Sequence, residues 1–361
     1  MKTNPGSKDP GLHGSRQRRG AVSNPAGRFE RLAFVPEIGD DADADAPAQP
    51  TELYRDTSKS ILAFNDSPDV PMDASVNPYR GCEHGCIYCY ARPYHEYLGL
   101  SAGTDFERRI FVKENAAALL REALSAKSWT PQVIGLSGVT DPFQPIERTL
   151  RITRACLEVL ADFRNPVAVI TKNHLVTRDI DLLAPMAQHD AALVFLSITT
   201  LDDELARTME PRASRPGLRL DAVRKLRDAG IPVGVMVAPI IPGLTDHEVP
   251  AILEAAAAAG ALSAGRTIVR LPHGVKELFA EWLGAHAPAR KEKVLNRIRD
   301  MRDGQLNDSA FGSRMTGDGP FAESIHQMFD LHRRRLGLTQ QLTLSTQAFR
   351  RAGGNQLDLF G

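Results

Sequence analysis

The sequence predicts an α/β fold in which helices cover a mostly parallel sheet. Short β-branched apolar runs alternate with helical patterns from about residue 70 onward. Gly230 and Gly260 follow two of the predicted helices, as C-terminal caps often do. About six strand–helix units fit into the chain, fewer than the eight of a closed barrel. We therefore expect an open sheet with helices outside.

The bounds of the expected elements follow from where each apolar pattern begins and ends. Predicted strands cover 74–77, 132–138, 167–172, 192–199, 232–239 and 266–271. Predicted helices cover 113–127, 147–163, 178–189, 218–229 and 247–259. Ligands of parallel α/β folds bind at the carboxyl ends of the strands, so functional residues are expected just after each predicted strand.

The stretches that flank this core have weaker patterns. Residues 1–60 are rich in Gly, Pro, Asp, Arg and Ser and predict a disordered arm, basic at first and then acidic. A solvated arm is the simpler interpretation, and a weak nucleic-acid contact from its basic part is the functional one. The core is expected over 70–272, a helical C-terminal extension over 273–337 and a flexible tail over 338–361.

Composition argues against several classes of protein. The chain has 44 Lys and Arg against 44 Asp and Glu, so bulk charge does not indicate nucleic-acid binding. No apolar run approaches the roughly 20 residues that span a bilayer, and the polar N-terminus does not resemble a signal peptide. Four cysteines, three of them clustered, indicate a metal site rather than a disulfide framework. We expect a cytoplasmic protein without a membrane partner.

The three clustered cysteines are Cys82, Cys86 and Cys89. Three thiolates this close can bind a four-iron cluster and leave one iron open for another ligand. Gly81 and Gly85 give the loop the backbone freedom to wrap an inorganic cube. The loop therefore predicts an iron–sulfur site.

The Cys-x3-Cys-x2-Cys spacing resembles the radical S-adenosylmethionine (SAM) enzymes. Four further segments resemble their spore photoproduct lyase-like branch, also called DNA repair photolyase-like: 77–82 (Asn-Pro-Tyr-Arg-Gly-Cys), 140–147 (Thr-Asp-Pro-Phe-Gln-Pro-Ile-Glu), 170–173 (Ile-Thr-Lys-Asn) and 210–212 (Glu-Pro-Arg). The resemblance covers 77 to about 246 and, more loosely, continues to 329. It implies an open (β/α)6 partial TIM barrel of the radical SAM type.

The same resemblance implies an activity. A [4Fe–4S] cluster on the three cysteines would cleave SAM reductively to a 5′-deoxyadenosyl radical, which abstracts hydrogen from a substrate. An electron donor such as flavodoxin or ferredoxin would reduce the cluster. A nucleic-acid lesion is the leading substrate class, with DNA as a partner, and a small molecule or protein is the alternative.

Six residues are implied to bind SAM: Thr140, Asp141, Lys172, Ser197, Glu210 and Arg212. Thr140 would contact SAM, Lys172 would pair with its carboxylate, and Ser197 would hydrogen-bond its ribose. Arg212 offers a planar fork that suits a carboxylate. The structural alternatives are a turn at Thr140, solvated cations at Lys172 and Arg212, and a salt bridge between Glu210 and Arg212.

Tyr88 and Tyr90 flank Cys89, and the resemblance implies that they relay a hydrogen atom. The alternative is that the two rings only shield the cluster. Spore photoproduct lyase itself uses a further cysteine as hydrogen donor, but residues 135–139 of this chain contain none. The remaining Cys156 lies in an apolar helical pattern and is expected to be a small buried residue.

The C-terminal run Gln356, Leu357, Asp358, Leu359 and Phe360 resembles the pentapeptide by which bacterial DNA polymerases and repair proteins bind the sliding clamp. Gln356, Leu357, Leu359 and Phe360 would contact the clamp, with modest affinity because the tail would order on binding. The alternative is that the apolar side chains fold back onto the protein.

Two other functions fit parts of the sequence. An iron–sulfur electron-transfer protein would need the cluster but no SAM pocket. A zinc-stabilised nucleic-acid-binding module would use His84 as a fourth ligand beside the cysteines. His84 lies between two of the cysteines, so strain is expected in a zinc site.

Overall fold

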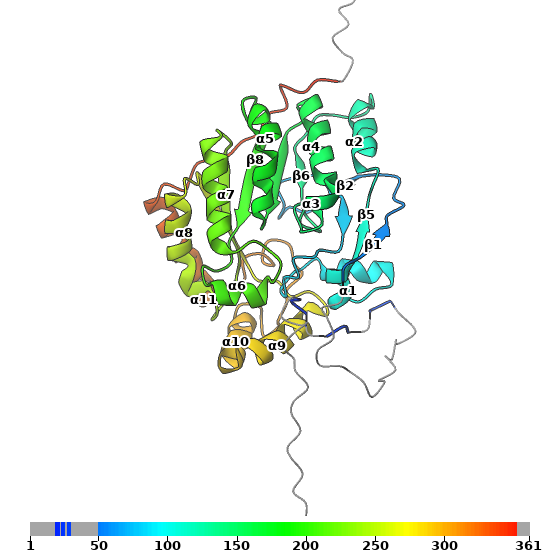
Figure 1. Cartoon of the computed structure of the whole chain (residues 1–361). Helices are drawn as coiled ribbons and strands as arrows, with labels where there is room; N and C mark the ends of the chain where they lie inside the picture. Colours follow the sequence, from blue (N-terminus) through cyan, green and yellow to red (C-terminus); the bar gives the residue numbers. More distant parts are fainter. Residues whose placement is uncertain (1–18, 22, 26, 30–49, 352–361) are drawn as a thin grey trace, which may run out of the picture.

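The computed structural model describes residues 19–21, 23–25, 27–29 and 50–351 (Figure 1). Its main sheet has the strand order β10-β9-β8-β7-β6-β3-β2. The strands are β2 (Leu62–Phe64), β3 (Ala74–Val76), β6 (Ile134–Leu136), β7 (Val167–Thr171), β8 (Ala192–Ser197), β9 (Val233–Ile240) and β10 (Ser263–Ile268). Adjacent strands from β3 to β10 pair in parallel, and β2 pairs antiparallel with β3. The predicted open sheet of six parallel strands is confirmed, with one short antiparallel strand added at its edge.

Helices lie along the outer face of this sheet (Figure 1). They are α2 (Ala116–Ser125), α3 (Glu147–Leu150), α4 (Ile152–Phe163), α5 (Ile180–Ala187), α7 (Pro216–Asp228) and α8 (Val249–Ala258). The helix predicted over 147–163 is broken at Arg151, which has a left-handed φ of 54°. The carboxylate of Glu147 accepts hydrogen bonds from the N–H groups of Thr153 and Arg154, and so satisfies two free donors at the start of α4.

A second, smaller sheet joins segments before and after the cysteine loop. Its strands are β1 (Glu52–Arg55), β5 (Arg109–Val112) and β4 (Tyr79–Arg80), in the order β1-β5-β4. The 3₁₀-helix η2 (Arg92–Leu98) and helix α1 (Thr104–Arg108) connect the cysteine loop to β5. The prediction of a disordered arm is wrong for β1, because pairing with β5 supplies backbone hydrogen bonds that a sequence pattern does not reveal.

The C-terminal extension is helical, as predicted. It comprises α9 (Val275–His286), α10 (Lys291–Asp300) and α11 (Pro320–Arg335). Helices α9 and α10 lie below α6 (Asp203–Met209) at one end of the molecule, whereas α11 packs beside α8 (Figure 1). Phe279 and Trp282 are fully buried and stack with centroids 6.0 Å apart in an apolar cluster shared by α9 and α10.

The tail expected from residue 338 onward packs against the body as far as residue 351. Thr339 forms a bridge with Ser263, and the N–H of Ser345 donates to the carbonyl of Asp190. The rings of Phe349 and Phe163 lie 6.1 Å apart. Flexibility is therefore the wrong prediction for 338–351, where spaced backbone contacts rather than an apolar stripe hold the chain. Gln356, Leu357, Leu359 and Phe360 lie outside the described residues.

In the described part of the chain, no helix is both long and apolar enough to cross a membrane.

Candidate functional site

The cysteine loop lies at the carboxyl edge of the main sheet and bends at two glycines. Gly81 and Gly85 have φ values of +80° and +66°, the left-handed region that favours glycine. A Cβ on Gly85 would lie 2.8 Å from a carboxylate oxygen of Glu107. The N–H of Cys82 donates to the carbonyl of Phe106 at 2.9 Å, which ties the loop to α1. The left-handed φ values at both positions, and the close contact at Gly85, explain why the predicted backbone freedom of glycine is used here.

The thiols of Cys82, Cys86 and Cys89 are close enough to influence one another. Burial raises the pKa of each thiol, and the neighbouring thiols raise it further for Cys82 and Cys86. Lys172 acts in the opposite direction on Cys86 and Cys89. Binding to iron releases thiol protons, and the nearby ammonium group favours the thiolates that result. The donor set therefore fits a cluster bound by three thiolates.

The His84 ring is held by two other side chains in this structure. Its Nδ1 lies 3.3 Å from the Asp141 carboxylate, and its Nε2 lies 3.1 Å from the side-chain amide of Asn173. Both ring nitrogens are thus engaged away from the thiols, which removes the fourth ligand that the zinc alternative requires. Within the described residues, no three His, Cys, Asp or Glu side chains converge tightly enough for a single ion. Ligands to different irons of one cluster need not converge in that way.

A buried ion pair between Arg92 and Glu107 holds the backbone of the cysteine loop. The Arg92 guanidinium donates to the carbonyls of Cys86 and Gly85 at 2.9 and 3.1 Å, and to those of residues 102 and 103. It also pairs with Glu107 at 2.6 Å, and both side chains are fully buried. The Glu107 carboxylate in turn accepts the N–H groups of Gly20 and of residue 21 at 2.9 and 2.7 Å. An N-terminal segment thus docks beneath the cysteine loop.

Sequence reasoning missed Arg92 and Glu107. The pair is separated by 15 residues and joins η2 to α1, so no helical or strand spacing marks it. Arg92 follows the cysteine motif closely, but only its burial marks it as important, and the sequence alone does not reveal that burial.

Asp141 connects the cysteine loop with the end of β7. Its carboxylate accepts the Thr171 hydroxyl at 2.7 Å and the N–H of Lys172 at 2.8 Å, in addition to its contact with His84. Burial by itself would raise the pKa of Asp141, but His84 and these hydrogen bonds hold the pKa below its ordinary value. A further bond from the N–H of Phe143, at 2.9 Å, makes Asp141 the first residue of a turn.

Thr140, Lys172 and Ser197 all lie at the carboxyl edge, as predicted. The Thr140 hydroxyl is buried and donates to the carbonyl of Tyr79 at 3.2 Å. The Lys172 ammonium donates to the carbonyl of Ala238 at 3.1 Å and lies 5.8 Å from the centre of the Tyr88 ring. The structure therefore brings three expected SAM contacts to the end of the sheet that carries the cysteines.

Glu210 is paired with Arg219, which the sequence analysis did not single out, rather than with Arg212. Both members of the pair are about 1% exposed, and Glu210 also accepts hydrogen bonds from the hydroxyls of Tyr88 and Thr199. Burial disfavours the charged form, but Arg219 and Lys172 hold the pKa of Glu210 at about 2. The proposed Glu210–Arg212 salt bridge is wrong because α7 directs Arg219 inward.

Arg212 takes part in a different contact. Its guanidinium pairs with Glu83 at 2.9 Å and donates to the Thr51 hydroxyl at 3.2 Å. The side chain of Arg212 is 29% exposed, so it is not a fully solvated cation.

The two tyrosines of the cysteine loop have different surroundings. Tyr88 is buried in an apolar cluster with Cys86, and its hydroxyl contacts Glu210 and Thr199. Tyr90 is 43% exposed, and its hydroxyl donates to the carbonyl of Gly138 at 2.5 Å. Cys156, in contrast, is fully buried in the core of the sheet and α4, as predicted.

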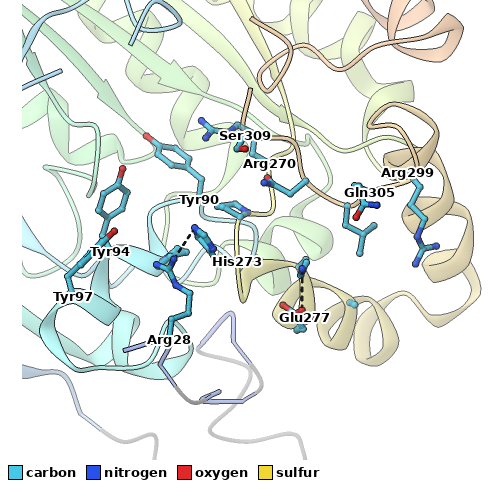
Figure 2. Close-up of a pocket in the computed structure, with 17 residues that line it drawn as sticks. Arg28, Tyr90, Tyr94, Tyr97, Arg270, His273, Glu277, Arg299, Gln305 and Ser309 are labelled. Carbon is cyan, nitrogen blue, oxygen red and sulfur yellow. Dashed lines mark hydrogen bonds and ion pairs between the residues drawn. The ribbon is translucent and has the colours of Figure 1, made fainter. Parts of the chain in front are cut away.

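A cavity of about 740 Å³ opens beside Tyr90. In Figure 2, Tyr94 and Tyr97 lie at one end of it, Arg299 and Gln305 at the other, and Arg270 and His273 between them. The cavity is lined by residues of η2 and of the C-terminal extension, and by Tyr90, which follows Cys89 directly.

The model of the radical SAM superfamily matches residues 76–256, which contain the cysteine loop and the four parallel strands β6 to β9. This chain belongs to the radical SAM superfamily. Membership implies an enzyme with a [4Fe–4S] cluster and SAM.

Relatives and solved structures agree with this assignment. An uncharacterized protein of Mycobacterium tuberculosis is 36% identical over 66% of this chain and 71% of its own length. The radical SAM Nalpha-GlyT isomerase of Pseudomonas phage M6 is 27% identical over 79% of this chain and 56% of its own length. Spore photoproduct lyase complexed with dinucleoside spore photoproduct has a similar fold, with a TM-score of 0.54, 15% identity and 79% of each chain covered. A mutant of that enzyme with bound AdoMet covers 81% of this chain and 82% of its own at the same TM-score and identity.

Proposed function

We propose that this chain cleaves SAM reductively and uses the resulting radical on a nucleic-acid lesion. The observation that supports it most strongly is the position of the three cysteines at the carboxyl edge, two buried and Cys89 half-buried, beside Asp141 and Lys172. When bound, the cluster on Cys82, Cys86 and Cys89 supplies the electron that cleaves SAM. The remaining chemistry belongs to residues around it.

Lys172, Thr140 and Ser197 are proposed to hold SAM. The Lys172 ammonium is kept at the edge of the sheet by the Ala238 carbonyl, where a carboxylate could pair with it. Asp141 fixes the backbone of Lys172 and so positions it. Arg212 would have to leave Glu83 to reach a ligand, which makes it the weakest of the predicted contacts.

Glu210 is proposed to act through Tyr88 rather than by contacting SAM. Its two oxygens are taken by Arg219, Thr199 and the Tyr88 hydroxyl. Tyr88 is thereby fixed as a shield in the apolar cluster that it shares with Cys86. Tyr90, half-exposed beside the cavity, is the better candidate for the hydrogen-atom relay, since residues 135–139 offer no thiol.

Two findings support a nucleic-acid substrate. Spore photoproduct lyase, which shares the fold, has been solved with a dinucleoside photoproduct. The cavity beside Tyr90 is lined by tyrosines and cationic side chains, which suit bases and phosphates. Flavodoxin or ferredoxin is the proposed electron donor, and the sliding clamp is a proposed partner through the C-terminal run.

Release of 5′-deoxyadenosine tests the chemistry. Anaerobically reconstituted protein, given SAM and dithionite, should form the product, and Cys82→Ala should form none. Cys156→Ala is the matched control, because Cys156 lies in a different apolar cluster from Cys82 and Cys86 and should retain the activity. Product from Cys82→Ala would contradict the proposal. A brown protein that binds no SAM would instead favour electron transfer.

A further inference from the structure

The cavity beside Tyr90 has more positive than negative side chains. Arg28, Arg270, Lys276 and Arg299 line it, against the single carboxylate of Glu277. Glu277 lies 3.8 Å from Lys276, and Glu96 pairs with Arg28 at 2.5 Å. Arg270 and Arg299 remain as the cavity's cations without a carboxylate partner in the described part of the chain. A ligand with negative charge is therefore favoured here.

Two buried polar atoms in the cavity wall lack hydrogen-bond partners within the part of the chain that the structure describes. They are Nε of Arg270, a donor, and Oδ1 of Asn307, an acceptor. Buried polar groups are normally paired, so each unpaired one needs an explanation. Both atoms are covered by protein, so a ligand would pair with them only after the two side chains turn toward the cavity, and it would then need an acceptor for the arginine and an N–H donor for the asparagine. A simple inorganic anion meets only the first requirement.

Flat aromatic surface completes the cavity. Tyr90, Tyr94 and Tyr97 are 43%, 52% and 67% exposed, which is unusual for large rings near one another. Tyr97 already stacks on Phe29 from the N-terminal segment, with centroids 5.1 Å apart. Exposed tyrosine faces beside arginines are typical of sites on which unpaired bases stack. In a duplex the base faces are covered by their neighbours, so a single strand suits these rings better.

We propose that this cavity binds a single-stranded nucleic-acid segment, with a phosphate at Arg270, a base stacked on Tyr94 and the edge of that base at Asn307. The proposal rests on the proposed function, because it places the nucleotide next to the reacting one beside Tyr90. Charge, ring surface and the unpaired donor and acceptor all occur in one nucleotide. An acidic peptide would match only the charge.

Fluorescence anisotropy of a labelled twelve-nucleotide single strand tests the site, with the reconstituted protein and the same sequence as a duplex. The single strand should bind at least tenfold more tightly than the duplex, and its affinity should fall steeply as salt rises. Arg270→Gln and Tyr94→Leu should each weaken single-strand binding about tenfold or more. Tyr94→Leu alters an exposed ring, so it remains informative if Arg270→Gln does not fold.

Arg224→Gln on α7 and Tyr54→Leu on β1 are matched controls outside the cavity and should bind the strand as the wild type does. Equal affinity for duplex and single strand, unchanged binding by Tyr94→Leu, or full competition by polyglutamate would overturn the proposal. Measuring SAM cleavage by the wild-type protein distinguishes failure of the cavity proposal from failure of the proposed radical chemistry. Cleavage without strand binding overturns the cavity assignment and leaves the radical chemistry standing, whereas strand binding without cleavage does the reverse.

Discussion

Glu107→Gln is expected to destabilise the apoprotein by about 3–5 kcal/mol, because it removes one charge of a fully buried ion pair. The substitution keeps the shape of the side chain but leaves the Arg92 guanidinium without a counter-charge. Arg92 retains its bonds to four backbone carbonyls, and these offset part of the loss. The new NH₂ group replaces one oxygen and so faces either the N–H of Gly20 or the N–H of residue 21, and an unpaired buried donor costs about 1–3 kcal/mol. The combined effect should therefore stay within the stated range.

Urea denaturation of the metal-free protein measures this change as a shift of the midpoint at constant slope. Iron per chain after anaerobic reconstitution, and the rate of its loss to a chelator, provide a second readout at the loop itself. Iron per chain should fall and the rate of iron loss should rise, since Arg92 holds the carbonyls of Gly85 and Cys86. Glu114→Gln is the matched control, because Glu114 forms an exposed pair with Arg55 and its loss should change little. A loss below about 1 kcal/mol with normal iron retention would refute the argument, and would mean that the carbonyls alone satisfy Arg92.

Three further changes test other parts of the chain. Gly20→Ala should release the N-terminal segment, since its Cβ would collide with the carbonyl of Gly85, and limited proteolysis near residue 20 should become faster; unchanged cleavage would contradict the docking. Trp282→Ala should cost about 3–5 kcal/mol in urea denaturation, because it empties a buried site stacked on Phe279, and a cost near zero would mean that α9 repacks. Phe360→Ala should weaken capture by the sliding clamp in a pull-down without changing SAM cleavage, and the clamp proposal fails if the wild-type tail captures none.

Local patterns predicted the fold and most positions at the carboxyl edge. The apolar runs placed Lys172 and Ser197 at strand ends, and the cysteine spacing located the loop, because these features depend on neighbours in sequence. The partners of those residues could not be predicted in the same way. Glu210 pairs with Arg219 instead of Arg212, a choice made by the direction in which α7 enters the core.

Pairings over long separations were the main omissions. β1 pairs with β5 across more than fifty residues, and the amides of Gly20 and its neighbour reach a carboxylate more than eighty residues away. Neither contact needs a particular side-chain period, because the N–H donors belong to the backbone. A sequence pattern rich in Gly and Pro therefore predicts disorder even where the segment packs beside the cysteine loop.

The tail leaves the described chain at residue 351 along the amino ends of the parallel strands, where Arg350 donates to the carbonyl of Phe163 and Arg351 to that of Trp129. The cysteine loop lies at the opposite, carboxyl edge, so the full length of the sheet separates the two. Gln356 follows Arg351 by five residues, which span at most about 18 Å when extended. A ring-shaped partner held by that tail would consequently approach from the pole opposite the reaction site. Capture of the partner and loading of the substrate would then take place on separate surfaces, and neither would block the other.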